Sequence, residues 1–213
     1  MRNAIILISF LLCSNFSTLM AQVSEKLLLP PANTTGGMPL MEALSKRQSQ
    51  RVFDSKPLST QQLSDMLWAA YGVNRPNGFR TAPSARTWNE FDIYVVMADG
   101  WYVYHPIEHC MMKLGSEDLR AASANQEFAH EAPVQLIFVA DFDRMTNADE
   151  AVRRFYSATD VGYISQNVYL YCASEGLATI VRGQIDKEKM KEHLKLRANQ
   201  HIILAQTVGY PGI

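Results

Sequence analysis

The sequence predicts a single α+β domain, and three observations carry that prediction. They are an amphipathic helix with a capping signal, a hairpin turn between two apolar runs, and a long apolar helix that stops at a glycine. The chain has 213 residues, of which 47% are hydrophobic and 19% are charged. Such a chain can bury a sizeable core as one domain, and it contains no internal repeat, low-complexity tract or evident linker.

The first 21 residues have the pattern of a secretory signal peptide. Arg2 precedes an apolar run that is too short to span a bilayer, and a polar stretch then leads to Ala21. We therefore expect export to the periplasm or the medium, with no stable membrane insertion after the signal is removed. Residues 22–38 are predicted to be an extended segment, in which residues 29–37 form a surface loop, and residues 39–213 to be the folded domain.

Two helices are predicted next. Residues 39–47 form a short helix, and Ser59 with Gln62 has the spacing of a capping box for a second helix that ends at Gly72. Five apolar residues recur at the helical interval in this second helix and predict a core stripe: Leu63, Met66, Leu67, Ala70 and Tyr71.

Strands are predicted in the middle of the chain. Asp99-Gly100 separates the apolar runs 92–98 and 101–104 and favours a two-residue hairpin turn. Residues 116–130 have a helical composition. The run 134–140 barely alternates between apolar and polar residues, so it is predicted to be a buried central strand.

The last third of the chain is predicted to begin with the longest helix. We expect it to start near Ser157, with Asp160 as a capping acid, and to end at Gly176. Because this helix is apolar on most faces, it needs cover from a sheet, neighbouring helices or a second subunit. A strand at 179–181, a helix from Asp186 to about residue 196 and a strand at 202–208 complete the fold.

Charge and composition exclude several classes of site. The formal net charge is −1, and no basic stripe alternates with aromatic residues, so nucleic acid is not an expected partner. Cys110 and Cys172 could form one disulfide after export, but the apolar surroundings of Cys172 favour a buried free thiol. Pro106 separates His105 from His109, which argues against a shared metal-binding helix face, and no metal site is expected.

The segment 46–53 predicts an anion-binding clamp. Arg47, Ser49 and Arg51 fall at alternate positions, so they can converge on one anion where the chain leaves its helix in an extended conformation. Arginine offers a planar fork of donors to phosphate, and serine adds a short neutral donor. The alternative is a solvated basic helix end, which the helix dipole also favours.

Seven segments in this order resemble the FMN-dependent nitroreductase superfamily, and in particular its peptide azoline-oxidase branch. The segments are KRQSQRVF at 46–53, PLSTQQLSDMLWAAYGVNR at 57–75, RTAPSA at 80–85, YVVMADGWYVY at 94–104, APVQLIFVAD at 132–141, GYISQNVYL at 162–170 and EGLATIVRG at 175–183. The resemblance implies a central, mostly antiparallel sheet flanked by helices, in an intertwined homodimer with FMN at the subunit interface.

The resemblance also implies a set of FMN contacts. Arg47, Gln48, Ser49 and Arg51 match the segment that grips the phosphate and ribityl chain. Pro83, Ser84 and Ala85 match the loop that reaches the flavin from the partner subunit. Ile180, Val181, Arg182 and Gly183 match the stretch beside the isoalloxazine ring, where a backbone N–H faces the reactive nitrogen and glycine allows close approach. For the Arg182 side chain, a solvent-exposed strand-end charge is the alternative.

The implied activity is the transfer of hydride from NAD(P)H or another donor to a small nitroaromatic or quinone-like acceptor by a ping-pong route. Three alternatives remain: an exported flavin-binding electron carrier, an azoline-type dehydrogenase, and a structural dimer without flavin. The sequence departs from the family in two places. The C-terminal residues 209–213 contain no basic side chain, and Arg86-Thr87-Trp88 follows the Pro-Ser-Ala loop, where relatives often have small residues.

Overall fold

A computed structural model describes residues 25–213 of the chain. The predicted signal peptide, residues 1–21, lies outside this range. Four α-helices lie within the described residues: α1 (Leu40–Lys46), α2 (Thr60–Tyr71), α3 (Glu150–Glu175) and α4 (Lys187–His193). Each of them is too short or too polar to cross a lipid bilayer.

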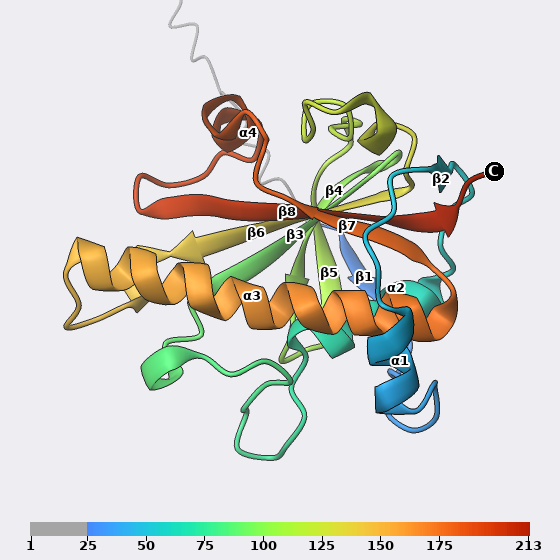
Figure 1. The fold of residues 1–213 in the computed structure, drawn as a ribbon. Coiled ribbons are helices and arrows are strands. Elements are labelled where there is room, and N and C mark those ends of the chain that lie inside the picture. Colours follow the sequence, from blue (N-terminus) through green and yellow to red (C-terminus); the bar gives the residue numbers. More distant parts are fainter. Residues whose placement is uncertain (1–24) are drawn as a thin grey trace, which may run out of the picture.

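An antiparallel sheet forms the centre of the fold (Figure 1). Its strands are β1 (Lys26–Leu28), β2 (Phe53–Asp54), β3 (Phe91–Met97), β4 (Gly100–His105), β5 (Cys110–Gly115), β6 (Val134–Asp141), β7 (Ala178–Arg182) and β8 (Gln200–Pro211). The order across the sheet is β1-β5-β4-β3-β6-β8-β2, and β7 pairs with β8 beside β2. The predicted α+β class and antiparallel sheet are confirmed.

The sheet separates two hydrophobic cores. On one face α2 and α3 pack against β3 and β6, with α1 against α3, while α4 lies on the other side (Figure 1). The predicted stripe of α2 is buried throughout, and the Ser59–Gln62 capping box is present. Strand β6 is buried along its whole length between β3 and β8, as its uninterrupted apolar run predicts.

Three predicted boundaries change. Helix α3 begins at Glu150 rather than near Ser157, because Asp149 accepts a hydrogen bond from the Val152 N–H (2.8 Å) and caps the helix there. Strand β1 lies within the segment 22–38, where only extended chain and loop are predicted. The hairpin turn is Ala98-Asp99, since Gly100 already belongs to β4, with a φ of 141°.

The helix predicted at 116–130 is wrong. This segment consists of turns and one short 3-10 helix at Glu127–Ala129. Its carbonyl groups accept side-chain hydrogen bonds instead of helical ones: Ser123 from Arg182, Ala124 from His130, and Ala129 from Gln135. These tertiary contacts compete with the helical pattern, and they override its local propensity.

Candidate functional site

The predicted clamp leaves α1 in the expected conformation. Arg47 is the C-cap of α1, and its backbone turns out of the helix at ψ 121°. Its N–H still donates to the Ala43 carbonyl (2.9 Å). The neighbouring Lys46 pairs with Glu42 on the same helix (2.7 Å). Residues 48–50 then run without regular structure toward β2, so the alternation of Arg47, Ser49 and Arg51 falls on irregular, non-helical chain.

Tyr169 joins the clamp to β7. Its hydroxyl is hydrogen-bonded to the Ser49 hydroxyl (2.8 Å) and accepts a hydrogen bond from the Val181 N–H (2.9 Å). The Arg47 guanidinium carbon lies 5.3 Å from the centre of the Tyr169 ring, within cation–π range. One buried side chain from α3 therefore holds two separately predicted segments, the clamp and the β7 strand, against each other.

The outer edge of β7 is the second part of the site. The Thr179 carbonyl accepts a hydrogen bond from the Gln50 N–H (3.0 Å), so the clamp runs along this edge. Thr179 and Val181 direct their backbone polar groups away from β8, since alternate residues of a strand face opposite neighbours. Gly183 follows directly after the last residue of β7.

A cleft of about 410 Å³ lies at the clamp. Lys46, Arg47 and Gln48 line one side of it, and Ala173, Gly176 and other residues from the end of α3 line the opposite side. Neither Arg47 nor Arg51 forms an ion pair with an acid among residues 25–213. Arg47 lines this cleft without an acidic partner among residues 25–213, which suits it to an anion, whereas Arg51 is not among the lining residues.

Arg182 is buried rather than exposed at a strand end, so that alternative is wrong. Only 4% of the residue is exposed. Its guanidinium donates to Thr207 Oγ1 (2.9 Å), Gln135 Oε1 (2.7 Å) and the Ser123 carbonyl (3.2 Å). Burial lowers the pKa of Arg182 to about 10. Gln135 lies on the sheet face opposite α3, so this guanidinium points away from Tyr169 and the clamp.

The Pro83-Ser84-Ala85 loop is held tightly by the residues around it. The Ser84 hydroxyl donates to Glu90 Oε2 (3.0 Å) and accepts a hydrogen bond from the Asn89 N–H (2.9 Å). The Ala85 N–H donates to Asp160 Oδ2 of α3 (2.9 Å). Beyond the loop, Arg86, Thr87 and Asn89 have positive φ values of 50°, 57° and 48°, a conformation that is costly for residues other than glycine.

Two buried acids lie behind this loop. Glu90 is fully buried and Asp160 is 3% exposed. Burial and, to a smaller degree, the neighbouring Asp160 raise the pKa of Glu90 to about 7. Burial also raises the pKa of Asp160, against the lowering effect of the Ala85 N–H. Asp160 is therefore not a helix cap, as its sequence position suggests, but an acceptor for the loop.

The clamp and the loop are held by different residues of α3. Both are anchored on α3, the loop through Asp160 and the clamp through Tyr169. These two residues are nine positions apart, about 13 Å along the helix axis. In Figure 1 the turn at 85–87 lies below the left half of α3 and α1 lies near its right-hand end. The two segments are thus anchored at separate points of the same helix.

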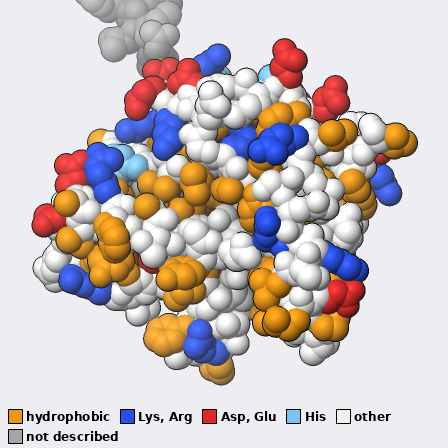
Figure 2. Space-filling model, in the orientation of Figure 1, with side chains coloured by type: hydrophobic (Ala, Val, Ile, Leu, Met, Phe, Trp, Pro, Cys, Tyr) orange, Lys and Arg blue, Asp and Glu red, His pale blue; other side chains and the backbone are white. Residues whose placement is uncertain are grey.

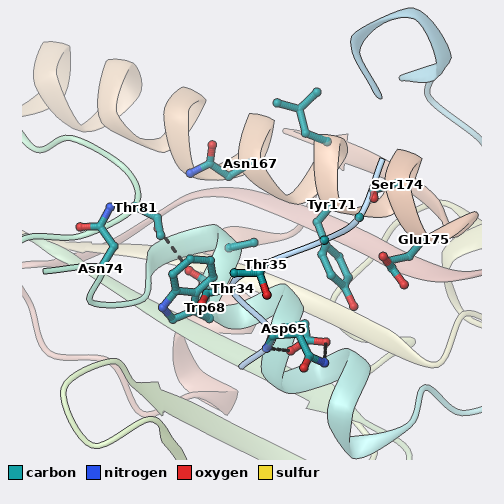
Figure 3. Close-up of a pocket in the computed structure, with 15 residues that line it drawn as sticks. Thr34, Thr35, Asp65, Trp68, Asn74, Thr81, Asn167, Tyr171, Ser174 and Glu175 are labelled. Atoms are coloured by element: carbon teal, nitrogen blue, oxygen red, sulfur yellow. Dashed lines mark hydrogen bonds between the residues drawn. The ribbon is translucent and has the colours of Figure 1, made fainter. Parts of the chain in front are cut away.

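A larger cavity lies between α2 and α3. It measures about 630 Å³ and is lined by Trp68, Tyr171, Asn167 and residues of the loop 33–37 (Figure 3). Asp65 in its wall already accepts hydrogen bonds from Asn33 (2.7 and 3.1 Å). Lysine and arginine are absent from the described lining, so this cavity is less suited to phosphate than the smaller cleft.

The β4–β5 turn brings together His105, Glu108 and Cys110, whose possible ligand atoms lie within 4.8 Å of one another. The Glu108 carboxylate is already paired with Lys26. Burial raises the pKa of the Cys110 thiol, which disfavours the thiolate that binds metals. Cys110 and Cys172 are both buried free thiols, as predicted for Cys172. These contacts favour a structural role for the turn.

Three residues of the site escape prediction from the sequence. Tyr169 falls within the apolar helix, where it is indistinguishable from a core residue. Glu90 precedes a strand without any motif. Asp160 has a recognisable position but is assigned the wrong role. The signal that could have found Tyr169 and Asp160 is a polar side chain on an otherwise apolar helix face, since such groups require a buried partner.

Comparisons with known proteins bear on the family and the fold. The model of the Nitroreductase family matches residues 44–210. A nitroreductase-like protein of Methanocaldococcus jannaschii is 36% identical over 182 residues, which cover 80% of this chain and 90% of that protein. The crystal structure of a nitroreductase-like protein from Ralstonia eutropha has a TM-score of 0.85 and 41% identity, covering 90% of this chain and 92% of that one.

A more distant structure shares the fold alone. The crystal structure of a nitroreductase-like protein from Anabaena variabilis has a TM-score of 0.76 at 19% identity, and the match covers 88% of this chain and 42% of that one.

Proposed function

The chain belongs to the nitroreductase family of oxidoreductases, and we propose that it uses FMN to pass electrons from a hydride donor to a small nitroaromatic or quinone-like acceptor. The observation that carries this proposal is the Tyr169 bridge, which holds the segment of Arg47 and Ser49 against strand β7. That juxtaposition places an anion site beside the strand that matches the flavin-ring segment of the family.

The residues present fit FMN. Arg47 and Arg51 supply charge-assisted donors for the phosphate, and Ser49 and Gln48 supply neutral groups for the ribityl hydroxyls. The backbone at Val181 faces the same edge, and the absence of a side chain at Gly183 leaves space for a flat ring: a Cβ built there would meet only Leu204 at 3.7 Å. The cleft beside the clamp has room for polar ligand groups.

FMN, when bound, supplies the hydride-accepting and electron-donating chemistry. The task of the protein is to bind and orient it. The clamp holds the phosphate end, while Tyr169 fixes the distance between the clamp and β7. The Val181 N–H at the β7 edge already donates to Tyr169, so a backbone donor to the ring would come from Gly183, and a rigid donor of this kind stabilises negative charge on a bound ring without rearrangement. A donor and then an acceptor would use the same open face in turn, which is a ping-pong route.

We propose that the protein acts as a homodimer. Phe155 and Tyr163 of α3 are 65% and 47% exposed, and Leu40 and Met41 of α1 are 63% and 75% exposed. Figure 2 shows hydrophobic side chains gathered on the face where α3 lies. An apolar surface of this kind favours a partner. In a dimer the Pro83-Ser84-Ala85 loop of one subunit would complete the clamp of the other.

The location of the protein bears on which electron donor it uses. The signal-peptide pattern of residues 1–21 supports a proposal of export, and nicotinamide cofactors are scarce outside the cytoplasm. NAD(P)H is the donor to test first, and a different reductant is the alternative for an exported enzyme. Cell fractionation with an antibody against the protein tests export: recovery of a shortened chain outside the cytoplasm supports it, and full-length protein in the cytoplasm contradicts it.

The visible spectrum of the purified protein, before and after incubation with FMN, tests the proposed function. We expect bound flavin that is bleached anaerobically by NADH or NADPH and reoxidised by a nitroaromatic or a quinone. Protein that takes up no FMN contradicts the proposal and favours a structural dimer. Flavin that is bound but stays oxidised with every donor tried favours an electron carrier, and oxidation of an azoline-containing peptide would identify the azoline-type activity.

A further inference from the structure

The Pro83-Ser84-Ala85 loop is anchored by a pair of buried acids. Ser84 donates to Glu90 Oε2 (3.0 Å) and Ala85 donates to Asp160 Oδ2 (2.9 Å), so adjacent loop residues are bound to two different carboxyl groups. One acid precedes β3 and the other lies inside α3. The loop position therefore depends on how these two carboxyl groups are arranged relative to each other.

Both carboxyl groups cannot carry a charge at this depth. Two buried carboxylates repel each other, and each loses its hydration, so one proton is retained between them. The second oxygen of Glu90, Oε1, is buried without a hydrogen-bond partner among the described residues. A proton on Glu90 would let it donate to Asp160, which leaves the Asp160 carboxylate to accept the Ala85 N–H.

The charged and titratable groups around the pair do not supply a counter-ion. Tyr71 of α2 is buried, and its hydroxyl has no hydrogen-bond partner among the described residues. The Arg80 guanidinium carbon lies 4.1 Å from the centre of the Tyr71 ring. Arg144, which follows β6, is already paired with Asp92 (2.7 Å) and Asp141 (3.4 Å). Neither arginine hydrogen-bonds to Glu90 or Asp160.

We propose that Glu90 and Asp160 are positioning residues that share one proton and thereby hold the Pro83-Ser84-Ala85 loop in the shape that completes the flavin site. Loss of that proton sets two carboxylates against each other behind the loop, which weakens the Ser84 and Ala85 hydrogen bonds. Flavin binding and loop order then decline together as the pH rises. The connection to flavin rests on the proposed function, whereas the connection to the loop does not.

Hydrogen exchange of the Ala85 amide tests the loop without flavin. The rate is measured on the full chain at pH 6 and pH 8 and corrected for the intrinsic pH dependence of exchange. We expect protection to fall at least about fivefold in the wild type, a coupling of ordinary size. In Glu90→Gln it stays constant, because an amide can donate to Asp160 without titrating. Equal behaviour of the two proteins would overturn the proposal.

A second variant covers the case in which Glu90→Gln does not fold. Asp160→Asn removes the other acid and keeps an acceptor oxygen for the Ala85 N–H, so its protection should also lose its pH dependence. If Asp160→Asn keeps the wild-type pH dependence, the shared proton is not the cause and the proposal is wrong.

The dissociation constant of FMN over the same pH range tests the connection to the site. The FMN phosphate titrates in this range too, but equally for wild type and Glu90→Gln, so the difference between the proteins isolates the acid pair. We expect wild-type affinity to fall relative to the variant by about fivefold or more. If the FMN affinities of wild type and Glu90→Gln changed equally with pH while the protection of their Ala85 amides did not, the connection to flavin would be overturned. No FMN binding at any pH would reject the proposed function, and the amide measurement would still decide the loop.

Discussion

The clamp side and the loop side of α3 use charge in opposite ways. On the clamp side, Arg47 and Arg51 lie near the surface without an acidic partner among residues 25–213, and Tyr169 positions the segment through neutral hydrogen bonds and a cation–π contact with Arg47. On the loop side, Glu90 and Asp160 are buried and bind the loop backbone and Ser84 directly. A binding surface keeps its charges available to a ligand, whereas a positioning element buries them to fix its own chain.

Removal of a clamp arginine gives the largest expected change in ligand binding. Arg47→Ala or Arg51→Ala should weaken FMN binding by roughly 1.5 to 3 kcal/mol, because each removes a charge-assisted contact with phosphate. The measurement is a fluorescence titration with FMN. Lys189→Ala, an exposed cation deletion on α4, is the control and should leave the affinity unchanged. If both arginine variants bound FMN with wild-type affinity, the clamp side of α3 would not be the side that binds the ligand through its charges.

The loop side should instead respond to pH. Because the folded-state pKa of Glu90 is about 7, above its ordinary 4.5, its contribution to stability is complete below pH 4.5 and is lost as pH rises through 7. We expect the free energy of unfolding of the wild type to fall by about 2 kcal/mol relative to Glu90→Gln between pH 5 and pH 8. His109 and His201, whose pKa values are lowered by burial, act in the opposite sense but equally in both proteins.

Urea denaturation of both proteins across this range measures that difference. A constant difference between wild type and Glu90→Gln would mean that Glu90 does not titrate near neutrality. The clamp variants provide the contrast, since deletion of an exposed arginine should not change the shape of the stability profile over the same pH range.

Tyr169→Phe should have a smaller effect on stability. It removes the hydroxyl that joins Ser49 to the Val181 N–H, and we expect a loss of about 1 to 2 kcal/mol in the free energy of unfolding. Tyr163→Phe deletes a hydroxyl from an exposed tyrosine of the same helix and is the matched control. If the two variants unfold at the same urea concentration, Tyr169 does not connect the clamp to β7.

Ser84→Ala gives the smallest expected change. The loop loses one hydrogen bond to Glu90 and one from the Asn89 N–H, and we expect a loss of about 1 kcal/mol in the free energy of unfolding. The exposed Ser116 serves as the control position, through Ser116→Ala. An equal effect at both positions would place Ser84 among ordinary surface residues.

The sequence predicts the fold better than it predicts the site. Apolar periodicity and the Ser59 cap locate α2 correctly, since these signals act within a few residues. The start of α3 is missed because Asp160 and Asp149 look alike as caps and only packing separates them. The helix at 116–130 fails because side chains bind its carbonyl groups: His130 and Gln135 from nearby in the sequence and Arg182 from a distant strand.

The site shows the same limit. Arg47, Ser49 and Arg51 are predictable because their chemistry is local. Tyr169 and Glu90 are not predictable in this way. Tyr169 acquires its role from Ser49, 120 residues away, and Glu90 acquires its role from Ser84, in a loop whose conformation the sequence does not specify. Arg182 lies near the strand predicted at 179–181, but its side chain is buried on the sheet face opposite α3. Which face it occupies depends on how β7 pairs with β8.

The central claim is that the clamp of one subunit and the loop of its partner form one flavin site, and subunit complementation tests it most directly. Arg47→Ala/Arg51→Ala impairs the clamp, and Ala85→Trp obstructs the loop. Each variant alone should bind little FMN. In co-expressed mixtures, a heterodimer has one site with an intact clamp and an intact loop, so about a quarter of wild-type FMN binding should return if subunits associate at random. Circular dichroism of each variant confirms that it folds. Mixtures that bind no more FMN than the separate variants would contradict a shared site.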